Sequence, residues 1–164
     1  MKLYTGIIAF ILMNLFFVSC SEDEYYRENV ELQGNYWDIN SPEEFLFDII
    51  DVETNYDIYL TFRYTNEYEY QRIFLTYVLE EEKKLTRDSA LVDFYFFHEK
   101  TGKPLGSGLG DIFDIRYQLI SGYSFKQPGK YRLRVNQFMR DERLENIKSV
   151  GIVIKESLPD AQSR

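Results

Sequence analysis

The stretch YDIYLTFRY, residues 56–64, alternates apolar and mixed side chains with a period of two. Successive side chains of a β-strand point to opposite faces, so this period predicts a strand with one buried face. The buried face would carry Tyr56, Ile58, Leu60, Phe62 and Tyr64. The other face would carry Asp57, Tyr59, Thr61 and Arg63.

Similar runs follow along the chain beyond residue 35. They predict strands at 73–79, 91–97, 112–119, 131–135 and 150–154, with earlier candidates at 37–39 and 44–50. Turn-forming segments at 65–70, 80–84, 100–110 and 127–130 separate them. The stretch MRDERLENI, residues 139–147, predicts one or two helical turns. This spacing of short strands predicts an all-β fold, a single antiparallel β-sandwich of jelly-roll or immunoglobulin-like type.

The first 19 residues have the pattern of a lipoprotein signal peptide. Lys2 precedes an apolar run, residues 6–18, which is too short to span a membrane. The run ends in FVSC, residues 17–20, which resembles a bacterial lipobox with Phe17 in place of the usual leucine. The resemblance implies cleavage before Cys20 and a lipid anchor on its sulfur, with an acyl chain such as palmitate on the new amino terminus. The alternative is an inert cysteine in an uncleaved anchor helix.

An acidic tract follows this cysteine. Ser21, Glu22, Asp23 and Glu24 resemble the export signal that sends lipoproteins of Bacteroidetes-type bacteria to the cell surface, although a solvated spacer would look the same. The predicted domain plan is a signal peptide at 1–19, a lipidated acidic tether at 20–35, a β-sandwich at 36–157 and a disordered tail at 158–164. The expected location is the cell envelope, anchored in the outer membrane by lipid, with surface exposure as the further possibility.

Composition argues against several functions. The formal charge is -8 and no basic run is present, so no nucleic-acid partner is expected. One histidine, His98, and one cysteine cannot form a metal-binding cluster, and no nucleophile elbow is found. Paired acids are expected by chance among 27 acidic residues. We therefore predict no catalytic residue, no metal and no cofactor apart from the covalent lipid on Cys20.

Several aromatic residues fall outside the clearest predicted strands or at their ends. Three interpretations remain open for them: packing in the core or at the sandwich edge, a protein interface, or stacking on sugar rings. These residues are Tyr25, Tyr26, Tyr36, Trp37, Tyr68 and Tyr70.

The C-terminal half carries a more specific pattern, in GKPLGSGLGDI (102–112) and in the run from Pro128 to Lys155. Together with FRYTNEYEY (62–70), these stretches resemble the gliding motility lipoprotein GldH family of Bacteroidetes. The matching positions are Arg63, Tyr68, Tyr70, Gly102, Lys103, Gly106, Gly108, Gly129, Tyr131, Gln137, Met139, Arg140, Leu144, Ile147, Val150 and Gly151.

The resemblance implies a non-enzymatic envelope lipoprotein. It would be an accessory component of the gliding machinery linked to type IX secretion, held to the membrane by its lipid and binding other envelope or motility proteins. The alternative is a surface glycan-binding lipoprotein of β-sandwich type. A glycan site would show two or three coplanar aromatic rings in a groove, flanked by Asp, Asn or Arg, whereas a protein-binding face would be flatter and mixed. Arg140 is expected to stabilise the turn at 137–144, and Gly151 to allow a close backbone approach.

Overall fold

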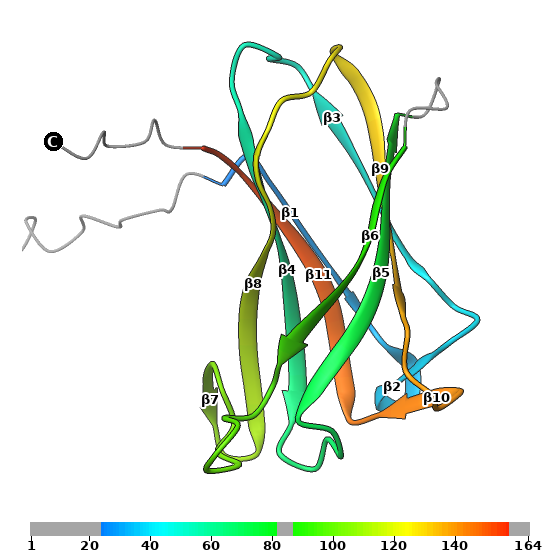
Figure 1. Ribbon diagram of the computed structural model, residues 1–164, viewed down its shortest axis with the longest axis vertical. Coiled ribbons are helices and arrows are strands. Elements are labelled where there is room, and N and C mark those ends of the chain that lie inside the picture. Colours follow the sequence, from blue (N-terminus) through cyan, green and yellow to red (C-terminus); the bar gives the residue numbers. More distant parts are fainter. Residues whose placement is uncertain (1–23, 82–86, 158–164) are drawn as a thin grey trace, which may run out of the picture.

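A computed structural model describes residues 24–81 and 87–157 and folds them into two antiparallel sheets that face each other (Figure 1). The predicted signal peptide, Cys20, the first three residues of the acidic tract and the C-terminal tail lie outside the described residues. No helix in the described part is long and apolar enough to cross a bilayer. The predicted all-β antiparallel sandwich is confirmed.

The first sheet has five strands, in the order β1 (Tyr26–Glu31), β11 (Ile147–Glu156), β4 (Tyr56–Thr65), β8 (Ile112–Tyr123) and β7 (Ser107–Leu109). The second sheet has four, in the order β3 (Glu43–Ile49), β9 (Gly129–Gln137), β5 (Arg72–Glu81) and β6 (Arg87–Tyr95). A small ribbon pairs β10 (Arg143–Glu145) with β2 (Tyr36–Asp38), and a 3₁₀ turn, η1 (Gln33–Asn35), precedes β2.

The strand order distinguishes between the two sandwich types that the sequence left open. The eight long strands, counted along the chain, are β1, β3, β4, β5, β6, β8, β9 and β11. One sheet then contains the first, eighth, third and sixth of them, and the other contains the second, seventh, fourth and fifth. This is the double Greek-key order of a jelly roll, and it differs from the immunoglobulin order.

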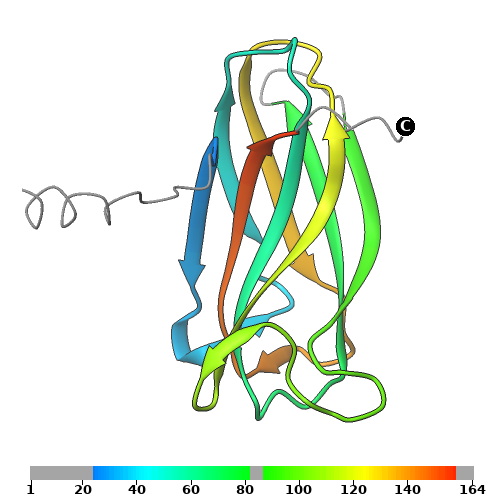
Figure 2. The same cartoon turned by 90° about the vertical axis from the view of Figure 1, so that its left-hand side faces the viewer.

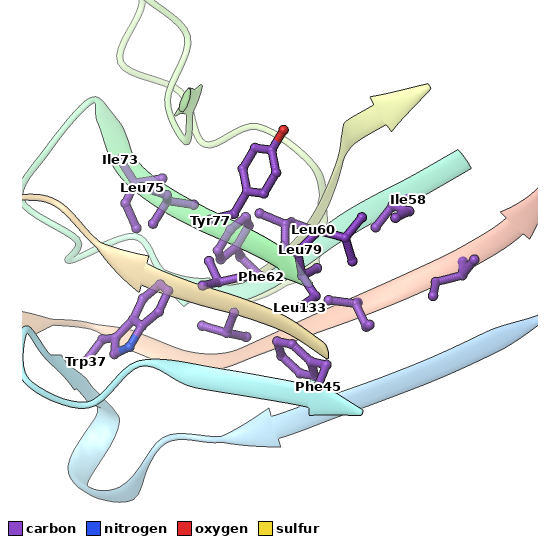
Figure 3. Close-up of a cluster of buried hydrophobic side chains, with 14 of the residues drawn as sticks. Trp37, Phe45, Ile58, Leu60, Phe62, Ile73, Leu75, Tyr77, Leu79 and Leu133 are labelled. Atoms are coloured by element: carbon purple, nitrogen blue, oxygen red, sulfur yellow. The ribbon is translucent and has the colours of Figure 1, made fainter. Parts of the chain in front are cut away.

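The core lies between the two sheets and is rich in aromatic rings (Figure 3). The inward face of β4 follows the predicted alternation, because Tyr56, Ile58, Leu60 and Tyr64 are fully buried. Phe45 on β3 and Leu133 on β9 meet them from the opposite sheet. Each such side chain contributes about 1.5–3 kcal/mol when it is removed from water.

The predicted tether proves too long. Residues 26–31 form β1, which pairs along its whole length with β11, and Tyr25 N donates to the Ile154 carbonyl (2.8 Å). The folded domain therefore begins before residue 36. The segment YRENVE was not recognised because it has a glutamate, Glu28, on the face that turns toward the core, between Tyr26 and Val30.

The predicted helical turns at 139–147 are also wrong. Leu144 lies on β10 opposite Trp37, and Ile147 is the first residue of β11. Both side chains are buried, but they belong to strands and not to a helix. Asn146 adopts φ 69° between the two strands and turns the chain from the ribbon into the main sheet. Pairing with β2 supplies the backbone hydrogen bonds that a helix would have made.

The strand register defines the two ends of the sandwich. At the end where the chain enters the fold, which we call the tether end, the register aligns Tyr26 with Ile154 and Ile58. At the opposite end, which we call the far end, it runs from Glu31 through Ser149 and Arg63 to Asp114. The connections at 66–71, 96–106 and 138–142 all lie at the far end (Figure 1).

Candidate functional site

A polar groove of about 650 Å³ crosses the outer face of the five-stranded sheet. Figure 2 views this sheet face on, with β1, β11, β4 and β8 side by side. The register places its outward side chains in two rows that run across the strands. One row is Glu31, Ser149, Arg63, Asp114 and Ser107; the other is Asn29, Gly151, Thr61 and Arg116.

The absence of a side chain at Gly151 shapes the middle of the second row. The Asn29 side chain lies over Gly151 and accepts a hydrogen bond from Thr61 Oγ1 (2.9 Å), so it spans strand β11. A Cβ at position 151 would overlap Asn29 Oδ1 and would lie 2.5 Å from the Glu28 carbonyl oxygen. The backbone of β1 therefore approaches β11 in a way that a larger residue would prevent.

Arg63 and Asp114 form a planar ion pair within the first row. Arg63 Nε and Nη2 donate to the two carboxylate oxygens at 2.8 and 3.1 Å, and this hydrogen bonding raises the pKa of Arg63. Both side chains are about half exposed, so the pair contributes little to stability. It does hold a guanidinium and a carboxylate in fixed positions in the groove.

Glu24, the last residue of the acidic tract, also reaches this face. Its carboxylate accepts hydrogen bonds from Arg27 Nε and Nη2, each at 2.6 Å, and from Arg116 Nη2 at 3.3 Å. The hydrogen bonds from Arg27 are the main cause of a lowered pKa at Glu24, with the charges of Arg27 and Arg116 adding to them. Two arginines thus hold one carboxylate beside the groove.

The glycine-rich loop forms one wall of the groove. Gly106 has φ 88°, and a Cβ there would overlap the Asp114 carbonyl oxygen. A Cβ at Gly108 would meet the carbonyl of Ile112 in the same way. These two glycines let β7 lie against β8. Gly102 and Lys103 form a separate turn, in which His98 N donates to the Lys103 carbonyl (2.8 Å) and Gly102 N to the His98 carbonyl (2.9 Å).

His98 itself organises this turn. It follows β6, and its Nδ1 accepts hydrogen bonds from Lys100 N (3.2 Å) and Thr101 N (3.4 Å). Across residues 24–81 and 87–157, no three His, Cys, Asp or Glu side chains are grouped to hold a metal ion.

Other motif residues form a hydrogen-bonded cluster at the far end, in which Tyr70 and Met139 are half-buried. Gln137 is fully buried; its Nε2 donates to the Asp141 carbonyl (2.9 Å), and its Oε1 accepts from Met139 N (2.8 Å). Phe74 N points at Met139 Sδ (3.3 Å), and the Tyr70 hydroxyl donates to the Asp141 carboxylate. That last hydrogen bond is the main cause of a raised pKa at Tyr70.

The aromatic residues left open by the sequence are largely packing residues. Trp37 is fully buried, and its Nε1 donates to the Ser41 carbonyl (2.9 Å). Tyr68 is buried with its ring centroid 5.0 Å from that of Phe96. Tyr25, Tyr26, Tyr36 and Tyr70 are half-buried. Gly129 and Tyr131 begin β9 at the tether end, where the Tyr131 hydroxyl donates to the Gln127 carbonyl (2.8 Å).

The expected structural role of Arg140 is not found. Arg140 is exposed, and no hydrogen bond or ion pair joins it to another residue of the described chain. Gln137 holds this turn instead. Side chains alternate through the segment QFMR: Gln137 and Met139 pack inward, whereas Phe138 is 60% exposed and Arg140 projects into solvent.

Replacing Gln137 by leucine should lower the free energy of unfolding by about 2–3 kcal/mol. The leucine fits the buried volume but leaves the amide of Met139 and the carbonyl of Asp141 without partners. Urea unfolding followed by circular dichroism measures the change. The same substitution at the exposed Gln118 is the control, and equal stability losses in the two variants would contradict this role for Gln137.

Sequence reasoning missed most of the groove. Arg27, Asn29 and Glu31 fell in the predicted tether, and Asp114, Arg116 and Ser149 lie on strands that the sequence defined only by their apolar residues. The one available signal was the polar face of residues 57–63, which supplies Thr61 and Arg63. Of the predicted motif residues, the structure brings Arg63, Gly106 and Gly151 to this sheet face.

Comparison with known proteins gives a family match along most of the chain. A family model described as GldH lipoprotein matches residues 24–154. A protein named gliding motility lipoprotein GldH homolog, from Christiangramia forsetii, is 28% identical over 93% of this chain and 96% of its own length. The gliding motility lipoprotein GldH of Flavobacterium johnsoniae is 26% identical over the same shares of the two chains.

Two solved virus structures also match. One, of the infectious bursal disease virus Gx strain, has a TM-score of 0.32 and 13% identity, over 82% of this chain and 30% of that chain. The other, the tobacco streak virus coat protein dimer, has a TM-score of 0.28 and 12% identity, over 88% and 99%. At these TM-scores the likeness carries no argument about this chain.

Proposed function

Because the chain belongs to the GldH lipoprotein family, we propose that it is a non-enzymatic accessory component of the gliding motility machinery linked to type IX secretion. Membership of a lipoprotein family fits a place in the cell envelope. In this proposal a lipid on Cys20 anchors the protein in the outer membrane, its acidic tract directs it to the surface, and the folded domain acts by binding another envelope or motility protein.

The observation that carries the proposal is the exposed apolar surface beside the motif segment QFMR. Phe138 is 60% exposed and Leu91 is 56% exposed. Phe138 N donates a hydrogen bond to the carbonyl of Phe74 on β5, and Leu91 on β6 pairs with Thr76, also on β5. Phe138 and Leu91 therefore lie on either side of β5, on the outer face of this sheet. We call Phe74, Leu91 and Phe138 the far-end patch.

The surroundings of the far-end patch match the anatomy of a protein interface. The Arg72–Asp93 ion pair (3.1 Å) and the Arg134–Glu44 ion pair (2.8 Å) lie on the same sheet face. An apolar centre with a polar rim is the usual arrangement, and exposed phenylalanine and arginine are frequent contact residues. This surface is mixed in character, as expected for a protein partner.

The position of the patch also supports this role. Three residues separate Cys20 from Glu24, and the four residue-to-residue steps limit that connection to about 14 Å. A lipid on Cys20 would therefore keep the tether end of the sandwich close to the membrane. Phe74 and Phe138 of the far-end patch lie toward the opposite end of the strands, and Leu91 lies midway along β6. A partner can therefore approach the patch without meeting the bilayer.

Replacing Phe138 by glutamate should abolish capture of the partner. A charge at the centre of an apolar contact loses its hydration without gaining a partner, so binding should fall by at least about tenfold. Crosslinking in living cells, followed by mass spectrometry of what is bound to the tagged protein, measures this. Motility or type IX secretion proteins should be recovered with the unchanged protein and lost from Phe138→Glu.

The matched control is Ile50→Glu, because Ile50 is 79% exposed but lies between β3 and β4 at the tether end. Both variants should keep the unfolding midpoint of the parent, since both side chains are exposed. Cys20→Ala should lose the same partners by losing the membrane. Recovery of the same proteins with Phe138→Glu, or their equal loss with Ile50→Glu, would rule out the far-end patch as the contact.

The sequence alternative, a glycan platform of stacked aromatic rings, finds little support in this fold. Trp37 and Tyr68 are buried, and the one aromatic residue that lines the groove, Phe62, points into the core with 2% of its surface exposed.

A further inference from the structure

We propose that the polar groove on the five-stranded sheet binds a polysaccharide that carries carboxylate groups, with uronate chains as the chemical class. This site lies on the opposite sheet from the far-end patch. It recognises its ligand by ion pairs and hydrogen bonds in place of ring stacking, and it does not depend on the proposed protein partner.

A carboxylate is already held at this face. Arg27 contacts both oxygens of Glu24, and Arg116 adds a third donor. A planar guanidinium matches the two oxygens of a carboxylate, and such charge-assisted pairs are the strong hydrogen bonds of proteins. Glu24 precedes the first strand, so its carboxylate is held by side-chain contacts and can be exchanged for the carboxylate of a ligand.

The charge of the groove favours an acidic ligand. Arg27, Arg63 and Arg116 line it, together with the carboxylates of Glu31 and Asp114. The Glu24 carboxylate beside the groove balances the third guanidinium group. When a ligand carboxylate displaces Glu24, it takes over this charge pairing on a chain whose formal charge is -8.

The spacing of the polar groups favours a sugar chain over a peptide. Each row crosses adjacent strands, so neighbouring groups are separated by about 4.8 Å, close to the length of one pyranose unit. The rows offer hydroxyl, amide and carboxylate groups, which suit vicinal sugar hydroxyls. A peptide would need pockets for alternate side chains, and the outward residues of both rows are polar or glycine.

The size and floor of the groove fit such a chain. Its volume of about 650 Å³ is within the range of small-ligand sites. Gly151 has no side chain, so the side-chain amide of Asn29 lies over it and accepts the hydrogen bond from the Thr61 hydroxyl in the floor of the groove. Ser107 and Ser149 extend the polar lining on either side of the Arg63–Asp114 pair.

Isothermal titration of the detergent-solubilised protein with a galacturonate tetramer tests the proposal. We expect binding at low salt, weakening as salt is raised, and no binding of the neutral galactose tetramer of the same linkage. Arg116→Gln should weaken binding by at least about tenfold. Arg134→Gln is the matched control, since Arg134 has 34% side-chain exposure against 32% for Arg116 and forms an ion pair on the other sheet.

Glu24→Gln gives a test of opposite sign. Removing the internal carboxylate should strengthen binding of the galacturonate tetramer several-fold, because the ligand no longer competes with Glu24 for Arg27 and Arg116. The proposal is overturned if the neutral tetramer binds equally well, if Arg116→Gln and Arg134→Gln behave alike, or if no heat is observed at millimolar ligand. Equal binding of a short polyglutamate peptide would retain carboxylate recognition but overturn the assignment to a sugar.

Discussion

Replacing Trp37 by alanine should lower the free energy of unfolding by about 3–5 kcal/mol, because a large, fully buried side chain leaves a cavity that its neighbours cannot fill. Trp37 lies on β2 opposite Leu144 and belongs to the same cluster as Phe45 and Leu133 (Figure 3). Its indole also fixes the loop after β2 through the Ser41 carbonyl.

Urea unfolding followed by far-UV circular dichroism measures this loss, since the chain has no other tryptophan to report by fluorescence. Trp37→Phe is the control, and it should lose less because it keeps most of the apolar volume and gives up the one hydrogen bond. An exposed tryptophan at a binding site would behave differently: Trp37→Ala would then bind poorly while unfolding at the midpoint of the parent. That result would contradict the packing role.

Replacing Gly151 by alanine should detach β1 from the sheet and cost about 2–4 kcal/mol. The added methyl group meets the Glu28 carbonyl oxygen at 2.5 Å, and a backbone atom cannot move aside as a side chain can. Because β1 is an edge strand, it can separate while the rest of the sandwich remains folded.

Limited trypsin digestion shows the difference, because detachment exposes the bond after Arg27. We expect rapid cleavage there in Gly151→Ala and slow cleavage in the parent. Ser149→Ala is the control: it lies two residues away on the same face of β11, where a Cβ is already present. Equal digestion of the two variants would show that the close approach at Gly151 has no structural effect. Detachment would also lengthen the connection between Cys20 and the folded domain.

The sequence predicted the sheet content well because the alternation is a local property. The period of two along residues 56–64 identified β4 and both of its faces, and the apolar runs identified β5, β6, β8, β9 and β11. It failed at β1, where a glutamate lies on the inward face, at β7, which lies inside the predicted turn segment 100–110, and at β10, where a short extended segment resembles a helical turn. At β1 and β10 the deciding contact is with a strand far away in the chain.

The candidate sites were harder to predict than the fold. Arg63 and Asp114 stand 51 positions apart and become partners only because β4 and β8 are neighbours. Gln137 was singled out without a role, whereas Arg140 was given the role that Gln137 performs. The sequence does not show which of two polar residues three positions apart points inward at the end of a strand, because that depends on where the turn begins.

The sequence by itself determined that this protein is an all-β domain of two-faced strands, and it identified the pattern of a lipoprotein family. These are properties of neighbouring residues, set by strand geometry and by short motifs. Only the tertiary structure decided the jelly-roll strand order, the burial of Trp37 and Tyr68, and the meeting of Glu24, Arg27 and Arg116. The physical reason is that strand pairing, which no local pattern encodes, brings side chains from distant segments onto one face.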